Sequence, residues 1–496
     1  MDVRIIDGFD MNPGCLKCRR KRINSTQFCG RCFATNSQIV NSGNINIDDF
    51  IKETQSPYRN INVSFLEWAP YDEFTNIEYI GKGGFSQIYK ATWKKHDGIN
   101  YILNGGFNGT CDQSKKDVVL KVLKDSQNVD TEFLNELKHT FQFDNQNPVE
   151  IIRCFGVTQE PQTKNYAFIL EYARNGDLQH FVYKNFEEFT WKKKIQYFYD
   201  IIGGINRIHG KKIIHRDLHS GNILVVRLVN RSRNDCAVIS DLGFSQPATI
   251  DSNLSRKSQI YGIIPYMAPE LFKNQPHSYA SDIYSLGMIM WQLTSGHRPF
   301  HDQEHGPKLI SDILDGKRPE ITEDTPECWA NLMKRCWHPD PSQRPTIQKI
   351  YELSEEYIYY YDSEYYSKKD HPDKYEEFKK AEDKRLEMIK LNKPFVTGCE
   401  HPNSRYYSTS LNSMLGSINS TITDPLSKND FDIMNINSNQ EINFEHSDRN
   451  SSLAENSKKL CLNELLQEEN IEDQHDFKRR KIVEYFDECF AENDMD

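Results

Sequence analysis

The sequence IIHRDLHSGNILVV at residues 213–226, followed after ten mostly polar residues by AVISDLGFS at residues 237–245, decides the fold. Its apolar runs predict short strands. The loop between the first two strands holds Asp217 and Asn222, and Asp241 directly follows the last strand. Either half alone could be an ordinary turn, in which an Asp side chain accepts backbone hydrogen bonds. Both halves together, in this order and flanked by apolar strands, predict a site that joins a carboxylate-bearing loop to a strand end.

These residues resemble the catalytic loop and the metal-binding loop of protein kinases, whose signature is H-R-D-x-x-x-x-N followed by D-F-G. Leu242 occupies the Phe position, which is a mild departure. Phosphoryl transfer needs Mg²⁺ held against the phosphates by hard oxygen ligands, and Asn222 and Asp241 can supply them. A carboxylate within hydrogen-bond reach can accept the proton of the acceptor hydroxyl, which is the role expected of Asp217.

A glycine-rich stretch, IGKGGFSQIY at residues 80–89, lies between two strand-like runs. Glycines let a backbone close over phosphates and offer amide N–H groups to the anion. The stretch resembles the kinase Gly-rich loop, with a serine in place of the third glycine. The resemblance implies that the ATP phosphates lie under Ile80, Gly81, Lys82, Gly83, Gly84, Phe85 and Ser86.

A lysine ends the apolar run at residues 118–121, where burial of its charge favours a charged partner. The run matches the kinase V-A-I-K pattern, with Val119 in the alanine position. Glu136 follows in a segment whose apolar residues recur at helical spacing. The resemblance implies an ion pair between Lys121 and Glu136 that holds the nucleotide phosphates, with Glu132 as the competing candidate.

The segment FILEYA at residues 168–173 resembles the last strand of the small lobe and the hinge between lobes. The resemblance implies that backbone groups at Glu171 and Ala173 meet adenine and that Asp177 reaches the ribose. The apolar sides of the adenine site are then expected from Ile88, Val119 and Leu224.

In the remaining part of the domain, residues 191–209 predict a core helix because isoleucines and a phenylalanine recur at three- and four-residue steps. Ala268-Pro-Glu270 resembles the A-P-E anchor, whose glutamate the family pairs with an arginine, here Arg344. Asp282 resembles the helix residue that braces the H-R-D backbone. A phosphate on the polar loop before the anchor could pair with the arginine of H-R-D. The candidates for this phosphorylation are Thr249, Ser252, Ser255, Ser258 and Tyr261.

Two departures from the kinase pattern bear on which hydroxyl, of Ser, Thr or Tyr, accepts the phosphoryl group. Serine/threonine kinases usually carry a Lys two residues after the catalytic Asp and a Thr ahead of A-P-E, whereas this sequence has His219 and Ile263. HRDLHSGN and the ending CWHPDPSQRP at residues 336–345 look most like the tyrosine-kinase-like group, whose members mostly phosphorylate Ser and Thr. The expectation is therefore a serine/threonine kinase, with tyrosine or dual specificity as the alternative.

Four cysteines near the amino terminus form two CxxC pairs, Cys15/Cys18 and Cys29/Cys32. Each pair is a turn that aims two thiolates at one point, and four thiolates make a closed structural Zn²⁺ site. Because so short a segment has little apolar content, metal binding would supply its folding free energy. A redox-active or unstructured cysteine cluster is the alternative.

Composition limits the remaining classes of function. The chain has 496 residues and a formal charge of −11, which argues against nonspecific binding to nucleic acid or to anionic membranes. No signal peptide is visible, no apolar run reaches the ~18 residues of a membrane span, and residues 283–293 read as a buried helix. The expected location is the cytoplasm, with the nucleus as the alternative because of basic clusters at residues 19–22 and 478–481.

The predicted fold is α+β: a two-lobed protein kinase with a five-stranded antiparallel β small lobe and a mainly helical large lobe. The domain layout is a zinc-binding module at 10–35, a linker at 36–72, a kinase domain at 73–358 (small lobe 73–173, large lobe 174–358), a charged helical extension at 359–395 and a mostly disordered tail at 396–496. The expected partners are ATP, protein substrates and an activating kinase, or the chain itself through autophosphorylation. The rival functions are a catalytically weak pseudokinase scaffold and a zinc-dependent nucleic-acid regulator. The four residues Lys121, Asp217, Asn222 and Asp241 weigh against a scaffold, because binding alone does not require them all.

Overall fold

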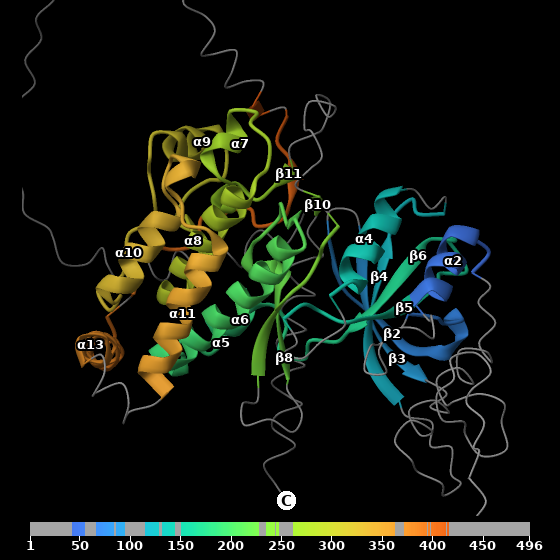
Figure 1. The fold of residues 1–496 in the computed structure, drawn as a ribbon, viewed down its shortest axis with the longest axis horizontal. Coiled ribbons are helices and arrows are strands. Elements are labelled where there is room, and N and C mark those ends of the chain that lie inside the picture. The colour runs from blue at the N-terminus through green and yellow to red at the C-terminus, as the bar shows by residue number, and fades with distance from the viewer. Residues whose placement is uncertain are drawn as a thin grey trace, which may run out of the picture. The chain divides into compact units, whose positions relative to one another are not determined.

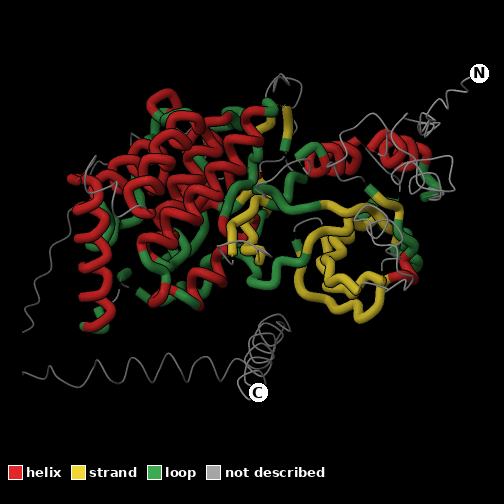
Figure 2. The backbone as a smooth tube through the Cα atoms, turned by 60° about the horizontal axis from the view of Figure 1, so that its bottom comes forward, coloured by secondary structure: helices red, strands yellow, loops and turns green. Residues whose placement is uncertain are grey.

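The computed structural model describes residues 42–54, 66–83, 86–94, 115–127, 131–143, 150–227, 235–243, 245–247, 261–362, 372–393, 395–396, 398–412 and 414–415. Within these residues a lobe of strands precedes a lobe made mainly of helices (Figure 1). Figure 2 shows the same division, with the yellow strands of the first lobe beside the red helices of the second. This is the order of lobes that the sequence predicts.

The small lobe is built on a six-stranded sheet in the order β1-β5-β6-β4-β3-β2. Its strands are β1 (Glu67–Trp68), β2 (Phe74–Lys82), β3 (Ser86–Lys94), β4 (Lys115–Leu123), β5 (Cys154–Gln159) and β6 (Tyr166–Glu171). Side chains alternate across β4, so that Val118, Leu120 and Val122 are buried in one apolar cluster while Val119 and Lys121 point to the other face. Helix α4 (Thr131–Phe141) covers that second face through Phe133, which packs against Phe168.

The prediction of a five-stranded, wholly antiparallel sheet was wrong by one strand. β1 lies in the expected linker at 36–72 and pairs in parallel with β5, where Glu67 faces Gly156. Helix α2 (Ile45–Thr54) lies in the same linker and buries Ile47 and Ile51 against α4. The Asn- and Ser-rich composition concealed these apolar residues, whose helical spacing lets one face of a short helix be buried.

The large lobe holds most of the helices. They are α5 (Leu178–Lys184), α6 (Trp191–Gly210), α7 (Pro269–Phe272), α8 (Tyr279–Ser295), α9 (Pro307–Leu314), α10 (Glu327–Cys336), α11 (Ile347–Asp362) and α13 (Pro372–Lys390). The predicted core helix at 191–209 is α6, which begins where the Thr190 side chain accepts a hydrogen bond from Lys193 N. The predicted buried helix at 283–293 lies within α8, where every residue from Ser281 to Ser295 is buried.

Short strands and 3-10 turns complete the described fold. They include β7 (Ile213–Ile214), β8 (Ile223–Arg227), β9 (Asp235–Ile239), β10 (Gln246–Pro247), β11 (Tyr261–Gly262) and β12 (Thr409–Ser410). Single 3-10 turns lie at η1 (Tyr71–Glu73), η2 (Phe186–Glu188), η3 (Ser220–Asn222), η5 (Ile264–Tyr266) and η6 (Pro341–Gln343). β8 and β9 pair as a two-stranded antiparallel sheet, which brings the end of β9 back beside η3.

The carboxyl-terminal part departs from expectation. The charged helical extension expected at 359–395 contains α13, which buries Phe378 in the large-lobe core and Arg385 beside the Glu187 carbonyl. Residues 398–412 and 414–415, placed in a disordered tail from 396 onward, also pack on the large lobe, and Leu411 and Leu415 join its apolar core. A few buried side chains hold this segment, although its overall composition is polar. None of the described helices is both long and apolar enough to cross a membrane.

Candidate functional site

A buried lysine links the two lobes. Lys121 Nζ lies 2.6 Å from Glu136 Oε1 on α4 and 2.8 Å from Asp241 Oδ1 at the end of β9. Lys121 reaches this point because it shares the sheet face that α4 covers. Of the two candidates on α4, Glu136 forms the pair, whereas the side chain of Glu132 lies outside the described residues.

The charges of this cluster stabilise one another. Burial by itself would lower the pKa of Lys121, but the carboxylates of Asp241 and Glu136 outweigh burial and raise that pKa. Burial would raise the pKa of Asp241, but Lys121 outweighs it and holds that pKa below the usual aspartate value. Burial raises the pKa of Glu136 despite Lys121. The cluster therefore contains a lysine that keeps its proton and an aspartate that stays ionised.

Asp282 holds the loop that carries Asp217. Its buried carboxylate accepts hydrogen bonds from the backbone N–H groups of His215, at 2.8 Å, and Arg216, at 3.0 Å. His209 Nε2, at the end of α6, lies 2.8 Å from the same carboxylate. Arg216 has φ 73°, a left-handed conformation that a non-glycine residue rarely adopts without such support. Asp282 thus fixes the backbone just before Asp217.

Hydrogen bonds also join this loop to Asp241. Asn222 donates its side-chain N–H to the carbonyl of Asp217 at 2.9 Å, and Ser240 N donates to the carbonyl of Asn222 at 2.8 Å. Asp241 follows Ser240 with φ 58°, a second left-handed residue. The structure therefore brings Asp217, Asn222 and Asp241 together although they span 25 positions of the chain.

The predicted adenine-site residues fall into two groups. On the sheet, Ile88 pairs with Lys121 and Val119 pairs with Leu170, so these side chains share the face that carries the lysine. On the hinge side, Ala173 packs in one apolar cluster with Leu224. Further members of this side are Glu171, whose N–H donates to the carbonyl of Arg153 at 3.0 Å, and Asp177, which forms a β-bridge with Leu224.

The Gly-rich stretch forms the turn between β2 and β3. Gly83 N donates to the carbonyl of Ser86 at 2.9 Å, and a Cβ on Gly83 would lie 2.8 Å from Ser86 Oγ. Ile80, Gly81 and Lys82 lie at the end of β2. Gly84 and Phe85 lie outside the described residues.

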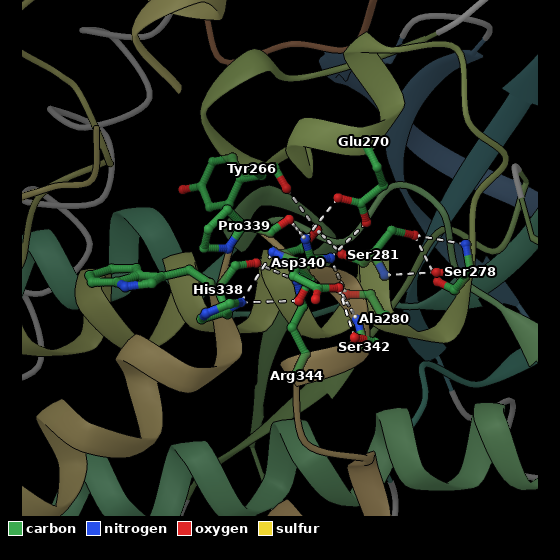
Figure 3. Close-up of polar contacts among 12 residues, drawn as sticks. Tyr266, Glu270, Ser278, Ala280, Ser281, His338, Pro339, Asp340, Ser342 and Arg344 are labelled. Carbon is green, nitrogen blue, oxygen red and sulfur yellow. Dashed lines mark hydrogen bonds and ion pairs between the residues drawn. The ribbon is translucent and has the colours of Figure 1, made fainter. Parts of the chain in front are cut away.

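A buried ion pair anchors the segment that leads to α7. Arg344 donates to both oxygens of Glu270 at 2.7 Å and to the carbonyl of Ala280 at 2.9 Å (Figure 3). Figure 3 shows the Arg344 side chain directed toward Glu270, with Ser278 to one side. The pairing holds α7 against the start of α8.

Side chains from two distant segments lie beside Asp217. His219 Nε2 lies 3.7 Å from Asp217 Oδ2, and Ile263 is buried nearby in the large-lobe core. Ser408 Oγ donates to Asp217 Oδ2 at 2.8 Å. Sequence reasoning missed Ser408 because it lies in an Asn- and Ser-rich stretch; the aromatic pair Tyr406-Tyr407 and the nearby leucines were the available signal.

Several predicted residues cannot be placed. The four amino-terminal cysteines lie outside the described residues, as do Thr249, Ser252, Ser255 and Ser258. Tyr261 is half-buried in β11. In the part of the chain that the structure describes, no three His, Cys, Asp or Glu side chains are grouped to hold a metal ion.

Comparison with known proteins agrees with this geometry. The sequence model of the family described as "Protein tyrosine and serine/threonine kinase" matches residues 74–353. A probable serine/threonine-protein kinase of Dictyostelium discoideum is 27% identical over 59% of this chain and 16% of its own length. Mitogen-activated protein kinase kinase kinase 13-A of Xenopus laevis is 28% identical over 57% of this chain and 25% of its own. Mitogen-activated protein kinase kinase kinase 12 of Rattus norvegicus is 27% identical over 57% of this chain and 27% of its own. The chain thus spans about a quarter or less of the length of these relatives.

Proposed function

The chain belongs to the protein tyrosine and serine/threonine kinase family, in the tyrosine-kinase-like group that its motifs indicate, and from this membership we propose its reaction. It transfers the γ-phosphoryl group of ATP to serine or threonine hydroxyls of protein substrates. The observation that carries the proposal is the contact of Lys121 with both Glu136 and Asp241, which ties a small-lobe strand to the metal-binding loop. A protein that only bound partners would not need a lysine buried between two carboxylates.

The residues of the cluster fit a magnesium nucleotide. Asp241 is ionised and Asn222 carries an amide oxygen, and these are the hard ligands that Mg²⁺ takes beside phosphates. When bound, the ion neutralises charge on the phosphates of ATP. Lys121 is assigned to the phosphates and Glu136 to the orientation of Lys121.

The nucleotide is assigned to the cleft face of the small-lobe sheet. Ile80, Gly81, Lys82, Gly83, Gly84, Phe85 and Ser86 are assigned to the phosphates. Ile88, Val119 and Leu224 are assigned to the two faces of adenine. Backbone groups of Glu171 and Ala173 meet its edge, and Asp177 meets the ribose.

Asp217 is assigned the role of accepting the proton of the acceptor hydroxyl. Burial would raise the pKa of Asp217, but His219 and the hydrogen bond from Ser408 outweigh burial and hold that pKa below the usual aspartate value. An ionised carboxylate held by a braced loop can both orient a hydroxyl and accept its proton as the oxygen bonds to phosphorus. His219 Nδ1 accepts a hydrogen bond from Gly221 N at 3.1 Å, which leaves Nε2 as the ring nitrogen that faces Asp217.

Serine and threonine are the proposed acceptors because the relatives named above include serine/threonine kinases and because HRDLHSGN fits their group. His219 and Ile263, which replace the usual lysine and threonine, make tyrosine or dual specificity the alternative. Assays with peptides that differ only in Ser, Thr or Tyr at one position decide between them. Faster transfer to the Tyr peptide would contradict the assignment.

The experiment that tests the reaction is incorporation of phosphate from labelled ATP with Mg²⁺ into a protein substrate. The variants Asp217→Asn and Lys121→Met should each lose at least about a hundredfold in rate, as expected for a missing proton acceptor or phosphate contact. A matched control is Lys334→Met, an exposed lysine in the last turn of α10 in the large lobe. Equal rates for the wild type and the two site variants would mean that a contaminant supplies the activity.

Outside the kinase domain, we propose that Cys15, Cys18, Cys29 and Cys32 hold one structural Zn²⁺. The CxxC spacing supports this assignment. Metal analysis of the full chain should find one zinc per molecule, and none after Cys15 and Cys18 are both replaced by serine. The proposed location is the cytoplasm, because Cys328, Cys336 and Cys399 are thiols rather than halves of disulfides in the part of the chain that the structure describes, as is typical of a reducing compartment.

A further inference from the structure

The segment that follows α13, residues 398–415, is held against the large lobe on both sides of Ser408. After Ser408, Leu411 and Leu415 are buried in the large-lobe core, at 1% and 4% exposure. Before it, the Tyr406 hydroxyl donates to the carbonyl of Pro299 at 2.9 Å, and the Tyr406 ring lies under the Arg298 guanidinium. Apolar burial and stacking therefore fix the chain at two points and leave Ser408 between them.

Backbone pairing fixes the direction of this segment. β12 (Thr409–Ser410) pairs antiparallel with β11, so that Thr409 faces Gly262 and Ser410 faces Tyr261. β11 leads into the turn that ends at the Glu270 anchor, so it belongs to the same rigid part of the lobe. An extended segment that adds a strand to an exposed edge is a usual mode of peptide recognition. Residues 406–411 thus lie as a bound peptide lies, although they belong to the same chain.

Ser408 makes the contact that a phosphoryl acceptor needs. Its Oγ donates to Asp217 Oδ2 at 2.8 Å, within the range at which a general base accepts a proton. The Asp217 side chain is 10% exposed, so few other hydroxyls could reach that oxygen while Ser408 occupies it. Ser404, on the same segment, donates instead to Glu400 at 3.4 Å. Among the hydroxyls described on this segment, Ser408 is the one bonded to Asp217.

We propose that Ser408 is a phosphorylation site that this chain's own active site modifies within the same molecule. The proposal rests on the kinase activity proposed above. Ser408 Oγ forms a bond to the γ-phosphorus of ATP while the bond from that phosphorus to the β,γ-bridging oxygen breaks. Asp217 accepts the serine proton, which then passes to solvent. The products are phosphoserine at 408 and ADP.

The test uses the full chain, treated first with phosphatase and then incubated with Mg²⁺ and ATP. Mass spectrometry should find phosphate on Ser408. Because the acceptor is tethered to the site, the half-time should stay constant when the protein is diluted about a hundredfold. Ser408→Ala should lose this phosphate, whereas the matched control Ser404→Ala should gain it at the wild-type rate. The Asp217→Asn chain, mixed with wild type, should stay unmodified at Ser408.

Myelin basic protein added to the same tube separates the two proposals. Phosphate on myelin basic protein with Ser408 unmodified overturns the assignment of Ser408 and leaves the kinase function standing. Absence of phosphate from both proteins overturns both proposals. A half-time that lengthens in proportion to dilution, or transfer to Ser408 of the Asp217→Asn chain, shows that the reaction occurs between molecules and overturns the proposal.

Discussion

Replacing Arg344 with methionine should lower the free energy of unfolding by about 3–5 kcal/mol, because it leaves the Glu270 carboxylate buried without its partner. The guanidinium of Arg344 has no exposed surface, and the side chain of Glu270 is 7% exposed. Methionine keeps most of the buried volume, so the change isolates the loss of charge and hydrogen bonds from the loss of packing.

The expected magnitude follows from the contacts in Figure 3. Arg344 makes five hydrogen bonds, two to Glu270 and one each to the carbonyls of Ala280, His338 and Pro339. An exposed pair would contribute only about 0–1 kcal/mol. Because Arg344 and Glu270 are both buried, water cannot replace a lost partner, and the larger loss of about 3–5 kcal/mol applies. Since a domain is stable by only about 5–15 kcal/mol, this loss would remove a large part of the free energy of unfolding.

Equilibrium unfolding in urea measures this change, and a double-mutant cycle with Glu270→Met separates the pair from its surroundings. The double variant should be less destabilised than the sum of the two single variants, because each single variant leaves one buried charge without its partner and the double variant leaves none. If Arg344→Met lowers the free energy of unfolding by less than about 1 kcal/mol, the pair contributes no more than a solvent-exposed ion pair does, and the argument from burial is refuted. Additive single effects would show that the two side chains do not act together.

Three further variants test other parts of the structure. Gly156→Ala should lower the melting temperature. A Cβ at residue 156 would lie 2.1 Å from the Glu67 carbonyl oxygen and would separate β1 from β5, at a cost of about 1–3 kcal/mol. An unchanged melting temperature in calorimetry would show that β1 shifts freely. Burial lowers the pKa of Lys194 from 10.5 to about 8 despite its contact with Asp324. Between about pH 8 and pH 10.5 the unfolded chain therefore binds more protons at this lysine than the folded chain does. Wild-type stability should therefore gain about 3 kcal/mol from this group as pH rises from about 8 to 10.5, and urea titrations of Lys194→Met should lack that gain. Asp282→Asn should cost about 1–3 kcal/mol in the same assay and lower kcat, since an amide N–H₂ cannot accept all of the loop's hydrogen bonds; unchanged kcat would mean that the loop does not need this brace.

The linker and the tail show where sequence reasoning stopped. Both stretches are rich in Asn and Ser, and their average composition predicts segments without a core. A small number of apolar side chains in each, Ile47 and Ile51 in α2 and Leu411 and Leu415 near β12, are nevertheless buried. Whether such a side chain is buried depends on a complementary surface formed elsewhere in the chain. Composition over a window does not contain that information.

The sequence by itself determined the lobe order, the family and the residues available for phosphoryl transfer. Those features depend on which side chains occur at which local spacing, and strand and helix periodicities can be read over a few residues. Only the tertiary structure decided which glutamate pairs with Lys121, that β1 extends the sheet, and that Ser408 lies on Asp217. Each of these is a contact between segments far apart in the chain, 191 positions in the case of Ser408. Such contacts form only because folding of the whole domain offsets the entropy lost in bringing distant segments together.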